Sequence, residues 1–338
     1  MSLLILYDMK DKFFSKLQKI DTYRFYTEKG IDSELLLWLD HTLKSTRNNI
    51  KLLLADLSLE TVEYQKKLEN FFTSIISLFP SLGSKFLETY TLTFGDCAEN
   101  HIRMQKIGTM ATTGFNLEDL SVAQIWFLKK GIECDIYKLN DMLTDDVVSD
   151  DAYILIAING LSLFGNPDDF YEEQRLLPKD SKIWSDKHGR VVNKNARHNL
   201  CFGPEAQSPK YEDKKGTIVA FDSVPLLASL RYHIPEVIGE KGRDLMVEGN
   251  YYYDSKCGIG FHSDIERKRV IGVRLGATMP LVFHWYLNSK PIGEYFKVNL
   301  KHGDVYIMSE KAVAPDGLKK KFPILRHAAG SDKYITIK

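Results

Sequence analysis

The chain has 338 residues, of which 44% are hydrophobic and 27% are charged, a composition that is typical of a folded globular protein and excludes long disorder. Its longest apolar runs, such as residues 153–158, are too short to cross a bilayer, and residues 1–7 lack the basic leader of a signal peptide. The four cysteines include no CxxC pair, which excludes a disulfide scaffold and a cysteine-based zinc site. A reducing cytoplasm or nucleus is therefore expected, without membrane contact.

Charge is unevenly distributed, although the net charge is zero. Residues 1–183 carry 20 Lys and Arg against 28 Asp and Glu, whereas residues 184–338 carry 25 against 17. This reversal predicts two domains with different partners. It makes the basic second half the better candidate for binding a polyanion such as nucleic acid.

Residues 1–180 predict an N-terminal α/β domain of unknown role, because helical and strand-like segments alternate. Helical spacing is found at residues 13–26, 33–43, after Ser58, and at 117–130, where Gly131 ends the helix. Strands are predicted at residues 51–55, 132–139 and 152–158. The sequence contains no GxGxxG motif and no phosphate-binding loop, so it does not indicate a nucleotide-binding domain.

One polar segment in this half has two interpretations. Asp96, Glu99, Asn100 and His101 lie within six residues. They predict either a polar site or partner-binding loop, or a helix N-terminus in which Asp96 caps and Glu99 closes a capping box. The spacing of three residues favours the capping box.

The second domain is predicted to occupy residues 184–338. Residues 160–187 read as a long connection rich in Gly, Pro and acidic residues. Short β-runs follow, which predict a sandwich or barrel and an α+β chain overall. These runs are residues 246–253, 269–277, 281–287, 296–300, 305–309 and 333–338.

The residues that indicate chemistry are His262, Asp264 and His327. Residues i and i+2 of an extended chain project to the same side, so the HxD tripeptide presents an imidazole and a carboxylate together. Two imidazoles and one carboxylate are the ligands of non-haem Fe(II) oxygenases, where they leave three positions of an octahedron open.

The surrounding sequence resembles the AlkB family of 2-oxoglutarate-dependent dioxygenases over residues 190–338. The resemblance rests on Asn250-x-Tyr252 ahead of the HxD, on VRLGA at 273–277, on LKHGDV at 300–305, and on Leu325-Arg-His327. It implies a double-stranded β-helix (jelly roll) in which His262, Asp264 and His327 bind Fe(II). It also implies that Asn250 and Tyr252 hydrogen-bond 2-oxoglutarate, that O₂ is the cosubstrate, and that residues 196–202 lead into a substrate lid.

The expected end of the domain departs from the family pattern. AlkB enzymes end with RxNxTxR, whose arginines bind the carboxylates of 2-oxoglutarate, whereas residues 332–338 read DKYITIK. If these residues form a strand, Lys338 is the first candidate for binding a carboxylate, as a point charge, and Lys333 is the reserve. Arg274 is a third candidate, and the alternative is that it is a strand residue whose side chain points outward.

The resemblance implies hydroxylation or oxidative demethylation, with a nucleic-acid base, single-stranded or methylated, as the expected substrate. The basic runs at 267–269 and 319–321 predict either phosphate contacts or solvated loops. The alternatives are a protein or small-molecule substrate, or a non-catalytic binding module, which the intact triad disfavours. A fragment that starts at residue 184 is expected to contain the whole catalytic centre.

Overall fold

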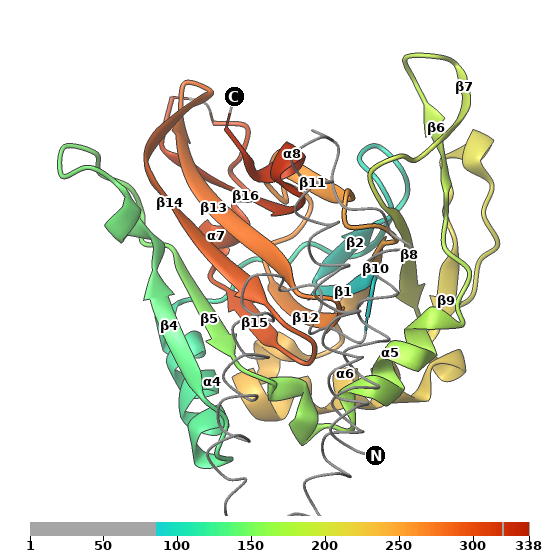
Figure 1. The fold of residues 1–338 in the computed structure, drawn as a ribbon, viewed down its shortest axis with the longest axis horizontal. Coiled ribbons are helices and arrows are strands. Elements are labelled where there is room, and N and C mark those ends of the chain that lie inside the picture. Colours follow the sequence, from blue (N-terminus) through green and yellow to red (C-terminus); the bar gives the residue numbers. More distant parts are fainter. Residues whose placement is uncertain (1–85, 320, 338) are drawn as a thin grey trace, which may run out of the picture. The chain divides into compact units, whose positions relative to one another are not determined.

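Two large β-sheets form the framework of the part of the chain that the computed structural model describes, residues 86–319 and 321–337 (Figure 1). The larger has eight strands, in the spatial order β4 (Cys134–Lys138), β5 (Tyr153–Ala157), β15 (Val305–Met308), β12 (Val270–Gly276), β1 (Thr89–Gly95), β10 (Met246–Tyr252), β8 (His198–Gly203) and β9 (Ile218–Ala220). The smaller has four, in the order β11 (Gly258–His262), β16 (Ile324–Gly330), β13 (Met279–Leu287) and β14 (Lys290–Leu300). Two hairpins complete the strands, β2 (Cys97–Glu99) with β3 (Lys106–Gly108) and β6 (Lys182–Ser185) with β7 (Arg190–Asn193).

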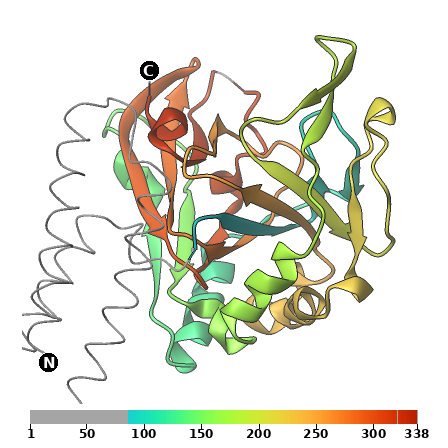
Figure 2. The ribbon, with the colours of Figure 1, turned by 45° about the vertical axis from the view of Figure 1, so that its right-hand side comes forward.

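Among the described residues, three longer helices lie together below the strands in both ribbon views (Figures 1 and 2). They are α4 (Leu117–Lys129), α5 (Pro167–Arg175) and α6 (Pro225–Ile238), and the short helices are α7 (Glu310–Val313) and α8 (Asp332–Ile335). Short 3-10 helices are found at Leu139–Met142, Gly160–Leu163, Tyr211–Asp213, Phe221–Ser223 and Glu240–Gly242. The described residues therefore form a mixed, sheet-rich α+β fold. None of their helices combines the length and apolar character that crossing a bilayer requires.

The helix predicted at residues 117–130 is confirmed as α4, Leu117–Lys129, and it ends just before Gly131, as predicted. Asn116 caps α4 by accepting from the backbone N–H of Asp119, whose carboxylate accepts in return from the N–H of Asn116. Gly131, with φ of 78°, follows the helix in the left-handed region that suits glycine. The prediction that residues 160–187 are only a connection is wrong, because Asn166 caps α5 and Pro167 opens it.

Strict alternation along β1 separates two interiors. Tyr90, Leu92 and Phe94 belong to the apolar core that the larger sheet shares with α4 and α6. Thr91 and Thr93 face the opposite side, where they line a cavity. A second apolar core includes Ile154, Ile156, Phe283, Trp285, Tyr306 and Met308 from strands of both sheets. All four cysteines are buried free thiols.

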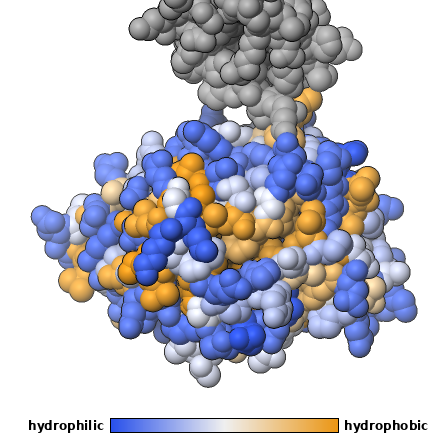
Figure 3. All heavy atoms as spheres, turned by 90° about the horizontal axis from the view of Figure 1, so that it is seen from below, coloured by the Kyte–Doolittle hydropathy of each residue, from blue (hydrophilic) through white to orange (hydrophobic). Residues whose placement is uncertain are grey.

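The outer surface on the helix side is mixed in character. Figure 3 looks at the molecule from below and shows apolar surface in orange among polar surface in blue. Exposed apolar side chains on α4 are Leu117, Val122, Ile125 and Leu128. Such exposure is ordinary for a globular protein and indicates no partner by itself.

The predicted domain boundary near residue 184 is wrong. Phe86–Lys338 form one compact unit, in which β1, β4 and β5 belong to the same sheet as β8, β10, β12 and β15. Strand β1 pairs with β10 on one edge and β12 on the other, so a fragment starting at residue 184 lacks a central strand. The unit carries 33 Lys and Arg against 34 Asp and Glu, so the charge reversal does not separate two domains. The elements predicted before residue 86 lie outside the described residues.

Candidate metal centre and its cavity

The three predicted ligands come together because two strands place them opposite each other. Strand β11 ends at His262, Asp264 follows two residues later, and His327 lies in β16. The two strands are antiparallel, and His262 and His327 are direct Cα partners in their register. The imidazole centroids are 4.3 Å apart. Cross-strand pairing therefore brings together two histidines that are 65 residues apart in the sequence.

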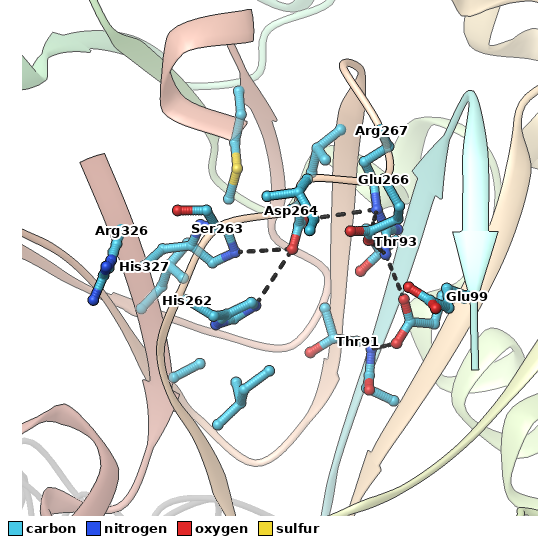
Figure 4. A pocket seen from close by; sticks show the side chains of 18 of the residues that line it. Thr91, Thr93, Glu99, His262, Ser263, Asp264, Glu266, Arg267, Arg326 and His327 are labelled. Atoms are coloured by element: carbon cyan, nitrogen blue, oxygen red, sulfur yellow. Dashed lines mark hydrogen bonds and ion pairs between the residues drawn. The ribbon is translucent and has the colours of Figure 1, made fainter. Parts of the chain in front are cut away.

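The distances within this group suit a metal ion. One potential ligand atom from each of His262, Asp264 and His327 lies within 4.8 Å of the others. Oδ1 of Asp264 lies 3.4 Å from Nε2 of His262 and 3.7 Å from Nε2 of His327. Figure 4 shows the three side chains pointing toward one another. Nδ1 of His262 lies 2.8 Å from the backbone oxygen of Gly260. A carbonyl oxygen can only accept, so the hydrogen of a neutral His262 lies on Nδ1 and leaves the Nε2 lone pair for a metal.

The electrostatics of the group favour the protonation states that bind metal. Burial and the neighbouring His262 lower the pKa of His327 to about 3, so its imidazole is neutral at physiological pH. Burial alone would raise the pKa of Asp264, but the charge of Arg267, helped by the neighbouring His327 and by His262, outweighs it and holds that pKa well below its usual range. A neutral imidazole and an ionised carboxylate are the forms that ligate metals.

Arg267 is the buried cation behind Asp264. Its side chain is 4% exposed, and its Nε lies 3.7 Å from Oδ2 of Asp264. The same guanidinium forms ion pairs of 2.7 Å with Glu248 and 2.6 Å with Glu266. A Cβ on Gly95 of β1 would come within 3.1 Å of Cδ of Arg267, so the glycine leaves room for this arginine. The prediction that residues 267–269 contact phosphate or form a solvated loop is therefore wrong for Arg267.

Asn250 and Tyr252 are both on the cavity side of β10, as their alternation predicted. The Asn250 amide oxygen accepts from Nε of Arg197 at 2.6 Å, and its amide nitrogen donates to Glu248 at 3.0 Å. Tyr252 is buried. Tyr251 points to the other side and stacks on Tyr90 with centroids 4.8 Å apart.

Arg274 points into the cavity, which excludes the outward alternative. It is 1% exposed and comes from β12. Its Nη1 donates to Oγ1 of Thr91 at 2.7 Å, while its buried Nε has no hydrogen-bond partner. Within residues 86–319 and 321–337 no carboxylate lies at ion-pair distance from it. A buried guanidinium without a counter-ion is costly, and this cost points to a ligand with negative charge.

The predicted last strand at 333–338 is wrong. Residues Asp332–Ile335 form α8, in which Lys333 is exposed and lies 5.3 Å from the ring of Tyr334 instead of in the cavity. Lys338 lies outside the described residues. The physical reason is that β10 and β12 are each paired on both edges, so a further strand has no edge to join beside Asn250 or Arg274.

The cavity has a volume of about 510 Å³ and contains the triad with Asn250, Tyr252 and Arg274. Its wall also includes Thr91, Thr93, Glu99 and His101, which the sequence did not place beside the triad. Two signals could have identified them: the polar cluster at 96–101 and the alternating threonines of β1, whose sequence is TYTLTFG. Residues 196–202, predicted to lead into a lid, contribute Arg197 to the cavity and otherwise enter strand β8.

The capping-box interpretation of Asp96 and Glu99 is wrong, because both lie in or beside strands. The carboxylate of Asp96 accepts from the backbone N–H of Ala111 at 2.6 Å, and of Lys268 and Arg269 at 2.9 Å each. It thereby holds the segment after the HxD tripeptide against the end of β1.

Replacing Asp96 by alanine is expected to destabilise the protein by about 3 kcal/mol or more, because three backbone donors lose their acceptor and each unsatisfied buried group costs about 1–3 kcal/mol. Urea denaturation followed by tryptophan fluorescence measures the change. Asp135→Ala, at an exposed position of β4, is the matched control and should change stability by less than about 0.5 kcal/mol. A similar loss in both variants would contradict this role of Asp96.

Comparison with known proteins places the chain in a family. No model of a known protein family matches it. The uncharacterized protein R156 of Acanthamoeba polyphaga mimivirus is 45% identical over 251 residues, which cover 73% of this chain and 98% of the viral protein. This chain belongs to the family of that mimivirus protein. Since the viral relative is uncharacterized, the activity of the family has to be inferred from the site.

Proposed function

We propose that this chain is an Fe(II)- and 2-oxoglutarate-dependent dioxygenase of the AlkB type, built on a double-stranded β-helix, or jelly roll. The observation that carries the proposal is the meeting of His262, Asp264 and His327 in one cavity with the buried Arg274. Two imidazoles and a carboxylate suit Fe(II). An arginine without a carboxylate partner in the same cavity suits an acidic cosubstrate.

Each residue of the cavity has a role in this proposal. His262, Asp264 and His327 would hold the iron, and Arg267 would keep the Asp264 carboxylate ionised and oriented. Arg274, with the hydroxyl of Thr91, would bind the distal carboxylate of 2-oxoglutarate, while Asn250 and Tyr252 would hydrogen-bond the rest of it. Bound Fe(II) supplies the chemistry in which 2-oxoglutarate, O₂ and a C–H bond give succinate, CO₂ and a hydroxylated carbon.

A methylated nucleic-acid base is the substrate we infer. Hydroxylation of an N-methyl group gives a product that releases formaldehyde and leaves the nitrogen demethylated. Support comes from Arg197 and Arg326, two half-buried cations that line the cavity and could meet phosphates. The near balance of charge in the unit Phe86–Lys338 favours local phosphate contacts over a broad basic surface, and it also leaves a protein or small-molecule substrate as the alternative.

Formation of succinate is the test of this function. Protein with Fe(II) and 2-oxoglutarate is expected to release succinate slowly alone and several-fold faster with a methylated single-stranded oligonucleotide, which should lose its methyl group. Unmethylated oligonucleotide is the control. Succinate formation that no oligonucleotide stimulates would favour the protein or small-molecule alternative. The absence of succinate from protein that binds Fe(II) would overturn the dioxygenase and leave a non-catalytic module.

A further inference from the structure

Helix α4 has two apolar faces, of which only one is buried. The helix lies at one end of the helix layer, where its neighbours are α6, β4 and β5 (Figure 1). Its inner face contributes Leu120, Ala123 and Phe127 to the core of the larger sheet. Its outer face carries Val122 and Ile125, each 52% exposed. The helix therefore presents a second apolar surface to solvent, which the packing of the sheet does not require.

The outer face of α4 has the spacing of a contact between helices. Its central row consists of Glu118, Val122, Ile125 and Lys129. These residues are separated by four, three and four positions, the alternation that keeps side chains on one side of an α-helix. Leu128, also 52% exposed, widens the apolar surface on one side of the row. A single exposed apolar residue needs no explanation, whereas a row with this spacing is typical of a helix that packs against another helix.

The two ends of this row carry opposite charges. Glu118 lies in the first turn of α4 and Lys129 in the last turn. Both side chains are exposed, and within residues 86–319 and 321–337 neither has an ion-pair partner. An acid at the start of a helix and a base at its end are favourable with the helix dipole. The dipole accounts for the two charges, but it does not account for the apolar residues between them.

The row is complementary to itself when two copies of α4 run antiparallel. With a two-fold axis between positions 123 and 124, Glu118 faces Lys129 of the second copy, and Val122 faces Ile125 of the second copy. Each contact occurs twice, because a two-fold interface uses the same surface on both chains. An apolar centre is then enclosed by polar pairs, as in other protein interfaces. A parallel arrangement would instead place like charges against each other at both ends.

We propose that the outer face of α4 is the contact surface of a homodimer, in which α4 pairs antiparallel with α4 of a second copy of this chain. A second copy is the occupant that the charges favour, because the row carries both members of each ion pair that it would form. A partner of uniform charge would match only one end of the row. No residue of α4 lines the cavity around the triad, so this inference does not depend on the proposed function.

The oligomeric state of the full chain at increasing concentration tests the proposal. One pair of helices is a small interface, so we expect a weak dimer whose fraction rises across the micromolar range. Analytical ultracentrifugation gives the dissociation constant. Ile125→Asp places a charge at the apolar centre and should leave the chain monomeric over the same range. Val148→Asp, a similar change at a position that is 88% exposed, is the matched control and should dimerise as the unchanged protein does.

Charge reversal tests the antiparallel pairing itself. Glu118→Lys and Lys129→Glu each place like charges against each other at both ends of the interface, and each should weaken association roughly tenfold or more. The variant with both changes has opposite charges facing each other again and should recover most of the association. The helix dipole alone predicts the reverse order, because both changes oppose it and their effects add. Far-UV circular dichroism verifies that each variant is folded.

Three results would overturn the proposal. The unchanged protein could stay monomeric across the whole concentration range. It could form a dimer that Ile125→Asp does not weaken, in which case another surface makes the contact. The variant with both charge reversals could associate more weakly than either single variant, in which case the two charges act on the helix and not across an interface.

Discussion

Replacing Asp264 by alanine is expected to abolish stoichiometric binding of Fe(II), which we expect at one ion per chain in the unchanged protein. Asp264 supplies the oxygen that both histidines face, at 3.4 and 3.7 Å. Changes in residues that only support metal ligands typically cost ten- to a hundredfold in affinity, so losing a ligand should cost more than about a hundredfold. Metal analysis after anaerobic loading and gel filtration measures the stoichiometry.

Two further variants sharpen this experiment. His262→Ala should have the same effect, because it removes one of the two imidazoles. Asp222→Ala, which removes an exposed carboxylate far along the chain from the triad, is the matched control and should bind one ion. If both site variants still bound one ion per chain, the iron assignment of the triad would be wrong.

The triad could be predicted from the sequence because its geometry is mostly local. His262 and Asp264 are two residues apart at the end of a strand, so their side chains lie together whatever the rest of the fold does. The run around Asn250 and Tyr252 alternates clearly and became β10, with both residues facing the cavity. His327 could not be assigned from nearby residues, because it lies 65 residues after His262. It was identified from the resemblance of Leu325-Arg-His327 to the family motif.

The role of β1 could not be predicted, because it depends on pairing with distant strands. Thr91 is the partner of Asn250 on one edge of β1 and of Arg274 on the other, and the hydrogen bond between Arg274 and Thr91 spans 183 residues. Register between such strands is determined by burial on the two faces of the complete sheet. The sequence alone therefore could not show that strands before and after residue 184 belong to the same sheet.

The two local errors have a similar cause. Asp96 and Glu99 have the spacing of a capping box. The carboxylate of Asp96 nevertheless accepts from the backbone N–H groups of Lys268 and Arg269, which are more than 170 residues away in the sequence. The alternation in the last residues of the chain is short, and β10 and β12, the strands it would need as neighbours, are already paired on both edges. A sequence pattern of only a few residues predicts secondary structure poorly where contacts with distant residues determine it.

Replacing Arg274 by glutamine is expected to weaken binding of 2-oxoglutarate by roughly ten- to a hundredfold, because a charge-assisted hydrogen bond to a carboxylate contributes about 1.5–3 kcal/mol. Binding of 2-oxobutyrate should change little, since this acid has the same 2-oxo acid end and lacks the distal carboxylate. Calorimetric titration of both acids into protein loaded with Mn(II) in place of Fe(II) gives the two affinities without turnover.

The comparison of the two acids separates a direct contact from a structural effect of removing a buried charge. Arg190→Gln, at an exposed position of β7, is the matched control and should leave both affinities unchanged. If Arg274→Gln weakened both acids equally, Arg274 would support the shape of the cavity and not bind the carboxylate. If neither affinity changed, the carboxylate would bind elsewhere, and Lys338 would be the next residue to replace. A loss confined to 2-oxoglutarate would assign the distal carboxylate to Arg274, the buried cation that β12 holds against Thr91 of β1.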